Sequence, residues 1–401
     1  MRRVAITGAG MVSPGGLSVA ESWRAVRDGR WLLAPASAGQ EETAGLMVAE
    51  IRDLDPERHF DRRQLVALDP VAQYAVIAAR EAVAMAGIAL GDIAPERTRC
   101  IIGSGTGGER THDEASRRVY GDKGQRLHPM TVPRIMQSGA ASHVALDQAI
   151  RGGVYAVSSA CASAAHALGQ AFADIRAGIA DVALAGGSEA CLSHSCIRGW
   201  QALHILSDDG CRPFSLGRRG LVLGEGAAIF VLEAYDQAVA RGADILAELV
   251  GFGMSSDAGS ITAPHADGMA RAMRGALADA RLSADAVDHV NAHGTGTQAN
   301  DATECAALAL VFGDRLGRIP VTANKSVLGH ALGASGAFEL AMAIMSLREE
   351  VLSPTAHFQT ADPACPVDCI PNAARDAAVS TILSNSFAFG GLNAALVVRR
   401  V

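Results

Sequence analysis

Residues 157–169 read VSSACASAAHALG, and residues 321–333 read VTANKSVLGHALG. Both segments start with valine and end in HALG, with the same spacing between the two ends. In this alignment Cys161 falls on Lys325, and the residues around both are small. The match suggests that one unit of structure occurs twice and carries a different polar residue at each turn.

Two further pairs of segments repeat in the same order. VAITGAGMVSPGG at 4–16 matches AELVGFGMSSDAG at 247–259, and CIIGSGTGG at 100–108 matches HVNAHGTGT at 289–297. In each pair the glycines keep their spacing. Three matches in one order indicate a duplicated unit.

Each copy of the unit alternates strand and helix signals. A strand with a Gly-x-Gly turn comes first, a helical stretch follows (74–87 and 269–280), and a buried strand then ends in Gly-Thr-Gly. Such alternation predicts α/β layers. No Pro/Ser-rich linker lies near 240–247, where the copies meet. We therefore expect one compact body made of two similar halves, residues 1–243 and 244–401.

Composition excludes several classes of protein. The 401 residues are 49% apolar and carry a net charge of -7, whereas nucleic-acid binding needs a basic surface. No apolar window reaches the ~18 residues of a membrane span, and the start MRRVAITGAG lacks the pattern of a signal peptide. We expect a cytoplasmic protein that binds neither nucleic acid nor membrane.

The eight cysteines show no disulfide-dense spacing, so we expect mostly reduced thiols. Cys365 and Cys369, in CPVDC, have no second ligand pair at metal-site spacing and are expected to be loop or core residues. No metal site is predicted.

Cys161 lies where a strand near 154–158 turns into a helix beginning near Ala162. A thiol at a helix N-terminus is expected to lose some proton affinity, and its small neighbours leave room for an acyl group. These features suit a nucleophile. The segment alone nevertheless favours a buried structural thiol over a nucleophile.

Other residues favour catalysis. His293 ends an apolar strand and is followed at once by glycines. Lys325 and His330 lie at the turn that matches the Cys161 turn, and a two-fold repeat would bring the two turns together. One thiol, two imidazoles and a lysine would then converge. His166 lies within a helix, five residues after Cys161, and is expected to be structural.

A dinucleotide site is the main rival reading of the glycine turns. TGAGMVSPGG at 7–16 resembles its fingerprint, but Ser13 replaces the third glycine and residues 25–35 show no strand ending in an acid. No Gly-x-x-x-x-Gly-Lys-Ser/Thr segment occurs either. An oxidoreductase with a nicotinamide cofactor is therefore disfavoured.

Several motifs together resemble a known family. They are SSACASA, AHGTGT, NKSVLGHALGASGA, SNSFAFGGLNAAL, RPFSLGRRGLVLGEGAAIFVLE and GGSEA. They look like the elongating β-ketoacyl-[acyl carrier protein] synthases of the thiolase-like fold, and the similarity covers essentially the whole chain. SACASA, CRPFS and RGW resemble the subgroup that includes nodulation protein E and synthases of specialised acyl or polyene pathways.

The resemblance implies a layered α-β-α-β-α fold, with the nucleophile in residues 1–243 and the histidines and lysine in residues 244–401. It also implies a decarboxylative Claisen condensation in fatty-acid or specialised chain elongation, in which Cys161 carries the acyl group. His293 and His330 would donate hydrogen bonds to the malonyl thioester oxygen, so neutral rings with a depressed pKa are expected.

The remaining site residues also follow from the resemblance. Lys325 would balance local charge, with Glu304 as its ion partner. The oxyanion hole would be the backbone N–H groups of Cys161 and Phe389, made accessible by Gly390 and Gly391. The acyl pocket would be lined by Thr106, Trp200 and Phe389.

The resemblance further implies an acyl carrier protein as partner. Its phosphopantetheine arm would deliver the substrates, so no tightly bound cofactor is expected. Carrier proteins are acidic, and the docking residues would be Arg62, Arg63, Lys123 and Arg126. A homodimer, or a heterodimer with a related ketosynthase or chain-length factor, is expected.

Two positions depart from the family pattern. Ser215 and Arg219 replace aspartates, and the second aspartate belongs to the lysine–glutamate network in relatives. Thr106 is smaller and more polar than the isoleucine often found there, which suggests a modified acyl chain. The alternative function is a chain-length-factor-type partner subunit, but such subunits typically lack the nucleophile. A degradative thiolase would need a second cysteine where Phe389 stands.

Overall fold

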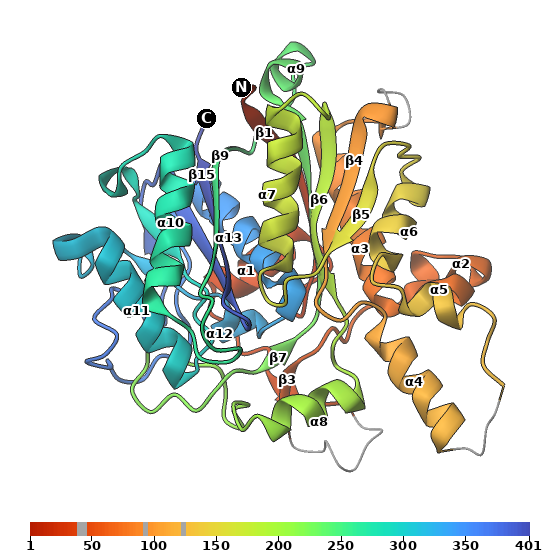
Figure 1. Ribbon diagram of the computed structural model, residues 1–401, viewed down its shortest axis with the longest axis horizontal. Coiled ribbons are helices and arrows are strands. Elements are labelled where there is room, and N and C mark those ends of the chain that lie inside the picture. Colours follow the sequence, from red (N-terminus) through yellow and green to blue (C-terminus); the bar gives the residue numbers. More distant parts are fainter. Residues whose placement is uncertain (38–45, 91–94, 122–125) are drawn as a thin grey trace.

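The computed structural model describes residues 1–37, 46–90, 95–121 and 126–401. Its main element is a mixed ten-stranded sheet with the order β5-β4-β6-β8-β1-β9-β15-β14-β10-β11 (Figure 1). The strands are β1 (Val4–Val12), β4 (Thr98–Gly103), β5 (Val154–Val157), β6 (Val182–Glu189), β8 (Gly226–Ala234), β9 (Ala247–Ser256), β10 (His289–Asn291), β11 (Val321–Thr322), β14 (Thr381–Ala388) and β15 (Leu392–Arg399). Short strands outside it are β2 (Ala34–Pro35), β3 (Met47–Ala49), β7 (Leu223–Gly224), β12 (Val351–Leu352) and β13 (Arg375–Asp376).

The strand order reflects the sequence repeat. β1, β4 and β5 of the first half correspond to β9, β10 and β11 of the second, and the order is symmetric about the β1–β9 pair. These two strands pair antiparallel, with Val4 opposite Leu249 and Ile6 opposite Ala247. The division between residues 243 and 244 stays our proposal for where one half ends.

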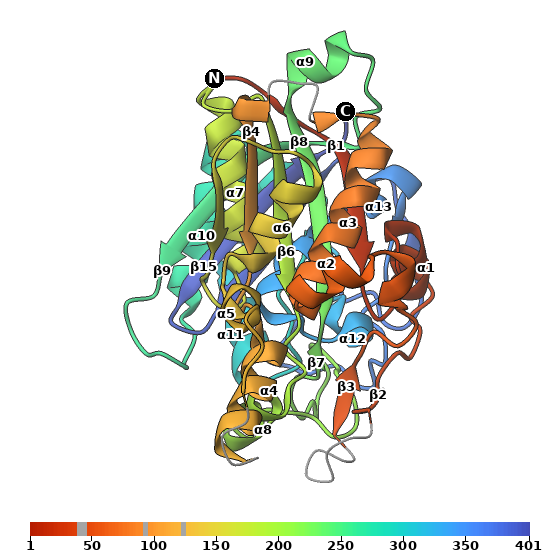
Figure 2. The same cartoon turned by 90° about the vertical axis from the view of Figure 1, so that its right-hand side faces the viewer.

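Helices form three layers around the two halves of the sheet. α7 and α13 lie between the halves, α3 and α6 cover one outer face, and α10 and α11 cover the other (Figures 1 and 2). The expected α-β-α-β-α arrangement is thus confirmed. The helices are α1 (Val19–Arg27), α2 (Arg62–Ala67), α3 (Pro70–Ala86), α4 (Glu109–Tyr120), α5 (Thr131–Ile135), α6 (Gly139–Asp147), α7 (Ser163–Arg176), α8 (His194–Ala202), α9 (Tyr235–Ala240), α10 (Ala266–Ala280), α11 (Gln298–Phe312), α12 (Lys325–Leu328) and α13 (Ser335–Glu349).

Local sequence signals set the helix ends. In α3 the Asp69 side chain accepts a hydrogen bond from the N–H of Val71, and Pro70 occupies the first helical position. The helix ends at Gly87, whose φ of 61° lies in the left-handed region that glycine adopts without strain.

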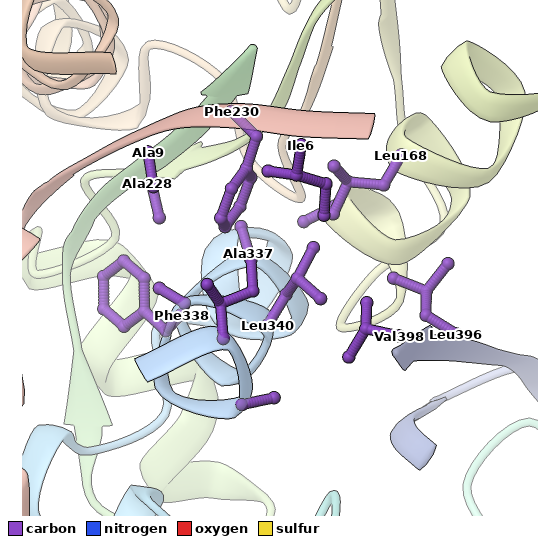
Figure 3. Close-up of a cluster of buried hydrophobic side chains, with 14 of the residues drawn as sticks. Ile6, Ala9, Leu168, Ala228, Phe230, Ala337, Phe338, Leu340, Leu396 and Val398 are labelled. Carbon is purple, nitrogen blue, oxygen red and sulfur yellow. The ribbon is translucent and has the colours of Figure 1, made fainter. Parts of the chain in front are cut away.

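The core lies around the two central helices. Figure 3 shows Phe338 and Leu340 of α13 between Ile6 and Phe230 of one half of the sheet and Leu396 of the other. β1, β6 and β8 are buried at every position, as expected for strands covered on both faces. In the part of the chain that the structure describes, no helix has both the length and the apolarity needed to cross a membrane.

The polar stretch 108–133 forms α4, α5 and their connection, part of which lies outside the described residues. α4 extends with α8 at the end of the molecule opposite the two chain termini (Figures 1 and 2). The Glu109 carboxylate joins these two helices by accepting hydrogen bonds from the hydroxyls of Ser193 and Ser195.

Candidate active site

Cys161 lies in a tight turn between β5 and α7. Ala160 before it has a φ of 49°, which is uncommon for a residue with a side chain and costs about 1–3 kcal/mol. Ser163 stabilises the turn, because its hydroxyl donates to the Ala160 carbonyl (2.6 Å) and accepts from the Ser159 N–H (2.9 Å). The turn directs the thiol into a cavity of about 300 Å³.

The two histidines line the same cavity as the thiol. His293 and His330 are 2% and 1% exposed, and their ring centroids are 5.3 Å apart with the rings nearly perpendicular. Both rings and Cys161 border the cavity, although the thiol comes from the first half of the chain and the histidines from the second. The structure thus brings these three residues together.

Hydrogen bonds orient both imidazoles. The Lys325 ammonium donates to His293 Nδ1 (3.3 Å) and to the His293 carbonyl (2.5 Å). An ammonium group cannot accept, so His293 carries its proton on Nε2. His330 Nδ1 is 2.8 Å from the Ser335 hydroxyl, which can donate to it. Nε2 of both rings is then a donor.

Burial and the Lys325 ammonium lower the pKa of both His293 and His330 well below the usual value. Both rings are therefore neutral near pH 7, in agreement with the expectation from sequence. A neutral ring with its proton on Nε2 can stabilise negative charge that develops in the cavity.

The thiol differs from the expectation. Burial raises the pKa of Cys161 to about 12, although the Lys325 ammonium opposes the rise. Burial therefore acts against the loss of proton affinity that the helix N-terminus was expected to cause.

Glu304 is not the ion partner of Lys325. Its carboxylate accepts from the N–H groups of His293 and Gly294, both at 2.9 Å, and so fixes the backbone of the histidine loop. Lys325, 2% exposed, forms an ion pair with Glu339 of α13 instead. Glu339 was missed, although a lone acid in the otherwise apolar stretch SGAFELAMAIM is a signal that could have identified it.

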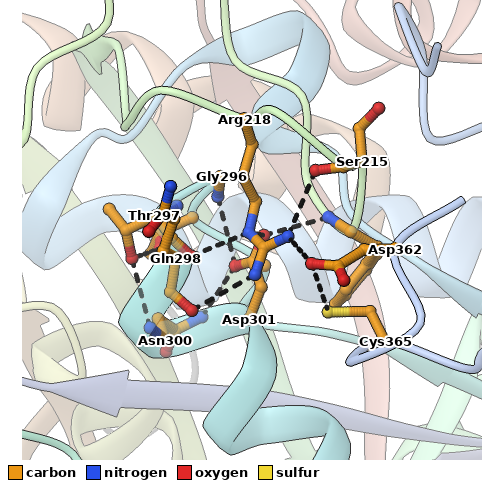
Figure 4. A network of polar contacts seen from close by, with 12 residues as sticks. Ser215, Arg218, Gly296, Thr297, Gln298, Asn300, Asp301, Asp362 and Cys365 are labelled. Atoms are coloured by element: carbon orange, nitrogen blue, oxygen red, sulfur yellow. Dashed lines mark hydrogen bonds and ion pairs between the residues drawn. The ribbon is translucent and has the colours of Figure 1, made fainter. Parts of the chain in front are cut away.

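The other end of loop 293–297 is held by a buried charged network (Figure 4). Asp301 accepts from the Gly296 N–H (3.2 Å) and lies 3.3 Å from Nε of Arg218, which is 4% exposed. Arg218 also pairs with Asp362 and donates to two backbone carbonyls of α11 and its cap. The loop is thus fixed on both sides.

The two departures from the family pattern lie outside the lysine network. Ser215 lies in the same loop as Arg218, and its carbonyl accepts a hydrogen bond from Arg218 Nη1 (3.1 Å). Arg219 is on the surface, with its side chain 59% exposed, and pairs with Asp208 at 3.0 Å. Arg219 thus pairs with surface carboxylates, whereas Lys325 contacts His293 and Glu339.

Two of the three predicted acyl-pocket residues line the cavity. Trp200 and Phe389 stack at its mouth, with ring centroids 5.7 Å apart and planes inclined by 19°. Thr106 is not among the lining residues, because its hydroxyl and its N–H both donate to the Glu189 carboxylate (2.6 and 3.1 Å). The assignment of Thr106 to the pocket is corrected accordingly.

Gly390 and Gly391 form the turn after Phe389 and have φ values of 83° and 67°. A side chain on Gly391 would place its Cβ 2.5 Å from Cβ of Asp257, so only glycine fits. The Gly390 N–H donates to the Ile261 carbonyl (2.7 Å). This turn holds the Phe389 backbone at the edge of the cavity.

The predicted docking residues are only partly described. Arg62 and Arg63 begin α2 and are exposed, after the Asp61 cap. Arg126 is also exposed, whereas Lys123 lies outside the described residues.

His166, expected to be structural, does not line the cavity. Its Nδ1 is 2.8 Å from the Ser159 hydroxyl, and its ring contacts Phe252 edge-on. Cys365 and Cys369 are buried in the core of the second half, as expected for core thiols.

Comparison with known proteins adds independent evidence. Residues 1–238 match the family model "Beta-ketoacyl synthase, N-terminal domain", and residues 246–359 match "Beta-ketoacyl synthase, C-terminal domain". The chain is 43% identical over 401 residues to nodulation protein E of Rhizobium sp. (strain N33), with 100% of both chains covered. It is 38% identical over 408 residues to 3-oxoacyl-[acyl-carrier-protein] synthase 2 of Staphylococcus aureus (strain N315), covering 100% of this chain and 98% of that protein.

Solved structures are similarly close. "The ishigamide ketosynthase/chain length factor" superposes with a TM-score of 0.94 at 35% identity and covers 100% of this chain and 99% of that one. A ketosynthase in complex with its type II acyl-carrier protein, bound to the hexaketide, gives a TM-score of 0.92 at 32% identity, with both chains covered completely.

Proposed function

Because the chain belongs to the β-ketoacyl synthase family, we propose that it elongates acyl chains on an acyl carrier protein. The reaction is a decarboxylative Claisen condensation between an acyl thioester held on Cys161 and malonyl-[acyl carrier protein]. The observation that carries this proposal is the common cavity of the Cys161 thiol and the two neutral imidazoles of His293 and His330.

Acyl transfer to Cys161 is the first step. The sulfur attacks the carbonyl of the acyl thioester, a new C–S bond forms, and the carrier thiol departs with the proton that Cys161 gives up. Covalent catalysis of this kind divides one difficult condensation into easier steps. The Lys325 ammonium favours the thiolate as it forms, because it is the main charge opposing the effect of burial.

Decarboxylation of the malonyl group follows. The bond to the carboxylate breaks, carbon dioxide leaves, and its electron pair moves onto the thioester as an enolate. Nε2–H of His293 and of His330 donate to the enolate oxygen. Each such preorganised donor contributes roughly 3–4 kcal/mol to the barrier reduction.

Condensation completes the cycle. The enolate carbon attacks the acyl carbonyl, a C–C bond forms, and the C–S bond to Cys161 breaks, which yields 3-oxoacyl-[acyl carrier protein]. Cys161 leaves as a thiolate and takes up one proton from water, which restores the resting thiol. The N–H groups of Cys161 and Phe389 would hold the oxyanion. Support for this oxyanion hole comes from the glycine turn at Gly390 and Gly391, which sets the Phe389 backbone beside the cavity.

Substrates would arrive on the phosphopantetheine arm of the carrier, so the reaction needs no tightly bound cofactor. The similar ketosynthase in complex with its acyl-carrier protein supports this partner. Arg62, Arg63 and Arg126 are exposed and are our candidates for carrier docking, with Lys123. The protein would act as a homodimer or with a related ketosynthase or chain-length factor.

The acyl chain itself is not assigned. The suggestion of a modified chain rested on Thr106, which the structure removes from the cavity wall, so it is not proposed further. Trp200 and Phe389 remain the candidates for acyl-pocket residues. A purely non-catalytic partner subunit is disfavoured, because the thiol and both imidazoles are in place.

Intact-mass analysis tests the proposal. The wild-type chain is incubated with an acyl carrier substrate, and it should gain the mass of the acyl group. Cys161→Ala should gain none, while Cys211→Ala, which removes another buried thiol, should be acylated like the wild type. Acylation of Cys161→Ala, or none of the wild type, would reject the assignment.

A further inference from the structure

Glu189, the last residue of β6, is a buried carboxylate that the reaction above does not use. It is 0% exposed, and it forms no ion pair with an Arg or Lys in the described ranges of the chain. Its oxygens accept five hydrogen bonds, from Ser104 Oγ (3.1 Å), Gly105 N (2.7 Å), Thr106 N (3.1 Å), Thr106 Oγ1 (2.6 Å) and Gly333 N (2.9 Å).

Three of these five groups are backbone N–H donors, and each of them requires an acceptor. A carboxylate is acceptor-only, whereas a glutamine would turn an NH₂ group toward at least one backbone N–H. Burial raises the pKa of Glu189, and the hydrogen bonds from Thr106, Gly105 and Gly333 oppose this rise, so the carboxylate is held here by its donors at a desolvation cost.

The carboxylate joins the two halves of the chain next to the catalytic residues. One set of donors lies in the turn after β4, and the other, Gly333, lies three residues after His330. The turns are so close that a Cβ on Gly333 would be 2.3 Å from Gly105 N. Ser335, which holds His330 Nδ1, follows two residues later. Glu189 therefore fixes the segment that orients this imidazole.

Glu189 also acts on the nucleophile electrostatically. Glu189, Glu339 and Lys325 act on the Cys161 thiol electrostatically, and the titratable side chains of His293, His330 and Asp257 line its cavity. The two glutamates raise the pKa of the thiol, the ammonium lowers it, and the histidines are neutral.

We propose that Glu189 is a positioning residue: its carboxylate holds the His330 segment in register with Cys161 for decarboxylation. The proposal rests on the condensing function given above.

The test compares Glu189→Gln with Glu233→Gln. Glu233 is also buried, at 2% exposed, and pairs with Arg241. It lies seven residues along β8 from Gly226, which is opposite Glu189 in the sheet, so the two carboxylates are roughly 23 Å apart. Two quantities are measured: release of carbon dioxide from malonyl-[acyl carrier protein], and the pH profile of Cys161 alkylation by iodoacetamide. Glu189→Gln should lower carbon dioxide release about 10–100-fold and move the alkylation profile to lower pH, whereas Glu233→Gln should do neither.

An unshifted alkylation profile, or carbon dioxide release equal to that of Glu233→Gln, would overturn the proposal. If Glu189→Gln does not fold, Glu189→Asp keeps the charge and shortens the reach. It should leave the alkylation profile in place and lower carbon dioxide release at least fivefold; unchanged release would overturn the proposal. Alkylation needs no carrier substrate, so this result stands apart from any failure of the condensing function.

Discussion

Replacing His330 by alanine should separate the two halves of the catalytic cycle. The substitution removes one of two Nε2–H donors aimed at the malonyl oxygen and leaves the Cys161 turn untouched, because that turn is held by Ser163. A lost donor of this type costs roughly 3–4 kcal/mol, and each 1.36 kcal/mol is a factor of ten, so decarboxylation should slow by about 10²–10³-fold.

The assay follows each half-reaction by itself. Carbon dioxide release from malonyl-[acyl carrier protein] reports decarboxylation, and the mass of the intact protein reports acylation of Cys161. Acylation by His330→Ala should stay within about threefold of the wild type. His166→Ala is the matched control, because His166 occupies the equivalent place in the first repeat, five residues after Cys161, and also bonds a serine hydroxyl through Nδ1.

The control should change neither rate by more than about twofold, since His166 does not line the cavity. If His330→Ala released carbon dioxide within fivefold of the wild-type rate, the imidazole would not be a donor to the enolate. If acylation fell as strongly as decarboxylation, the assignment of acylation to the Cys161 turn and of decarboxylation to the His330 turn would be wrong.

Three other outcomes follow from the contacts of the site. Lys325→Met should lower the free energy of unfolding by about 3–5 kcal/mol in chemical denaturation, because it leaves Glu339 buried and unpaired. The double variant with Glu339→Leu should recover this stability but not the activity, and equal stability of the single and double variants would contradict the reasoning. Charge reversal at Arg62 and Arg63 should raise the apparent KM for carrier substrates and spare hydrolysis of small thioesters, so an unchanged KM would count against docking there. The cavity imidazoles are neutral in the fold because their pKa is lowered, so protonation of these rings should not reduce carbon dioxide release between pH 8 and about 6.5, and a loss of decarboxylation with a midpoint near 6.5 would refute the neutral assignment. Below about 6.5 the two rings should lower stability, because the unfolded chain binds protons that the folded rings do not, whereas Glu339, whose pKa burial raises to about 7, acts in the opposite direction.

The fold was predictable because its turns repeat. Glycine is required where a helix backbone packs closely on a strand: a Cβ on Gly10 would lie 1.9 Å from the Ala78 carbonyl oxygen, and one on Gly253 would lie 2.2 Å from that of Ala272. These two glycines therefore occupy matching positions in the two halves. The convergence of Cys161, His293 and His330 followed from the same repeat, because matched turns meet at the axis of a duplicated unit.

The details that failed depend on contacts between distant elements. Sequence spacing could not show whether Glu304 or Glu339 pairs with Lys325. The Glu304 carboxylate instead accepts hydrogen bonds from two backbone N–H groups of the histidine loop, and Glu339 forms the ion pair. Thr106 is removed from the pocket by Glu189, which arrives from another strand. The proton affinity of Cys161 depends on burial that only the assembled layers create.

Identification of the product tests the central claim most directly. The wild-type protein is supplied with acyl carrier substrates of several chain lengths and malonyl-[acyl carrier protein], and the carrier-bound products are identified by mass. The result predicted is a 3-oxoacyl carrier two carbons longer than the starting chain, with one carbon dioxide released per product and none of that product from Cys161→Ala. Carbon dioxide release without elongation, or elongation that survives loss of the Cys161 thiol, would contradict it.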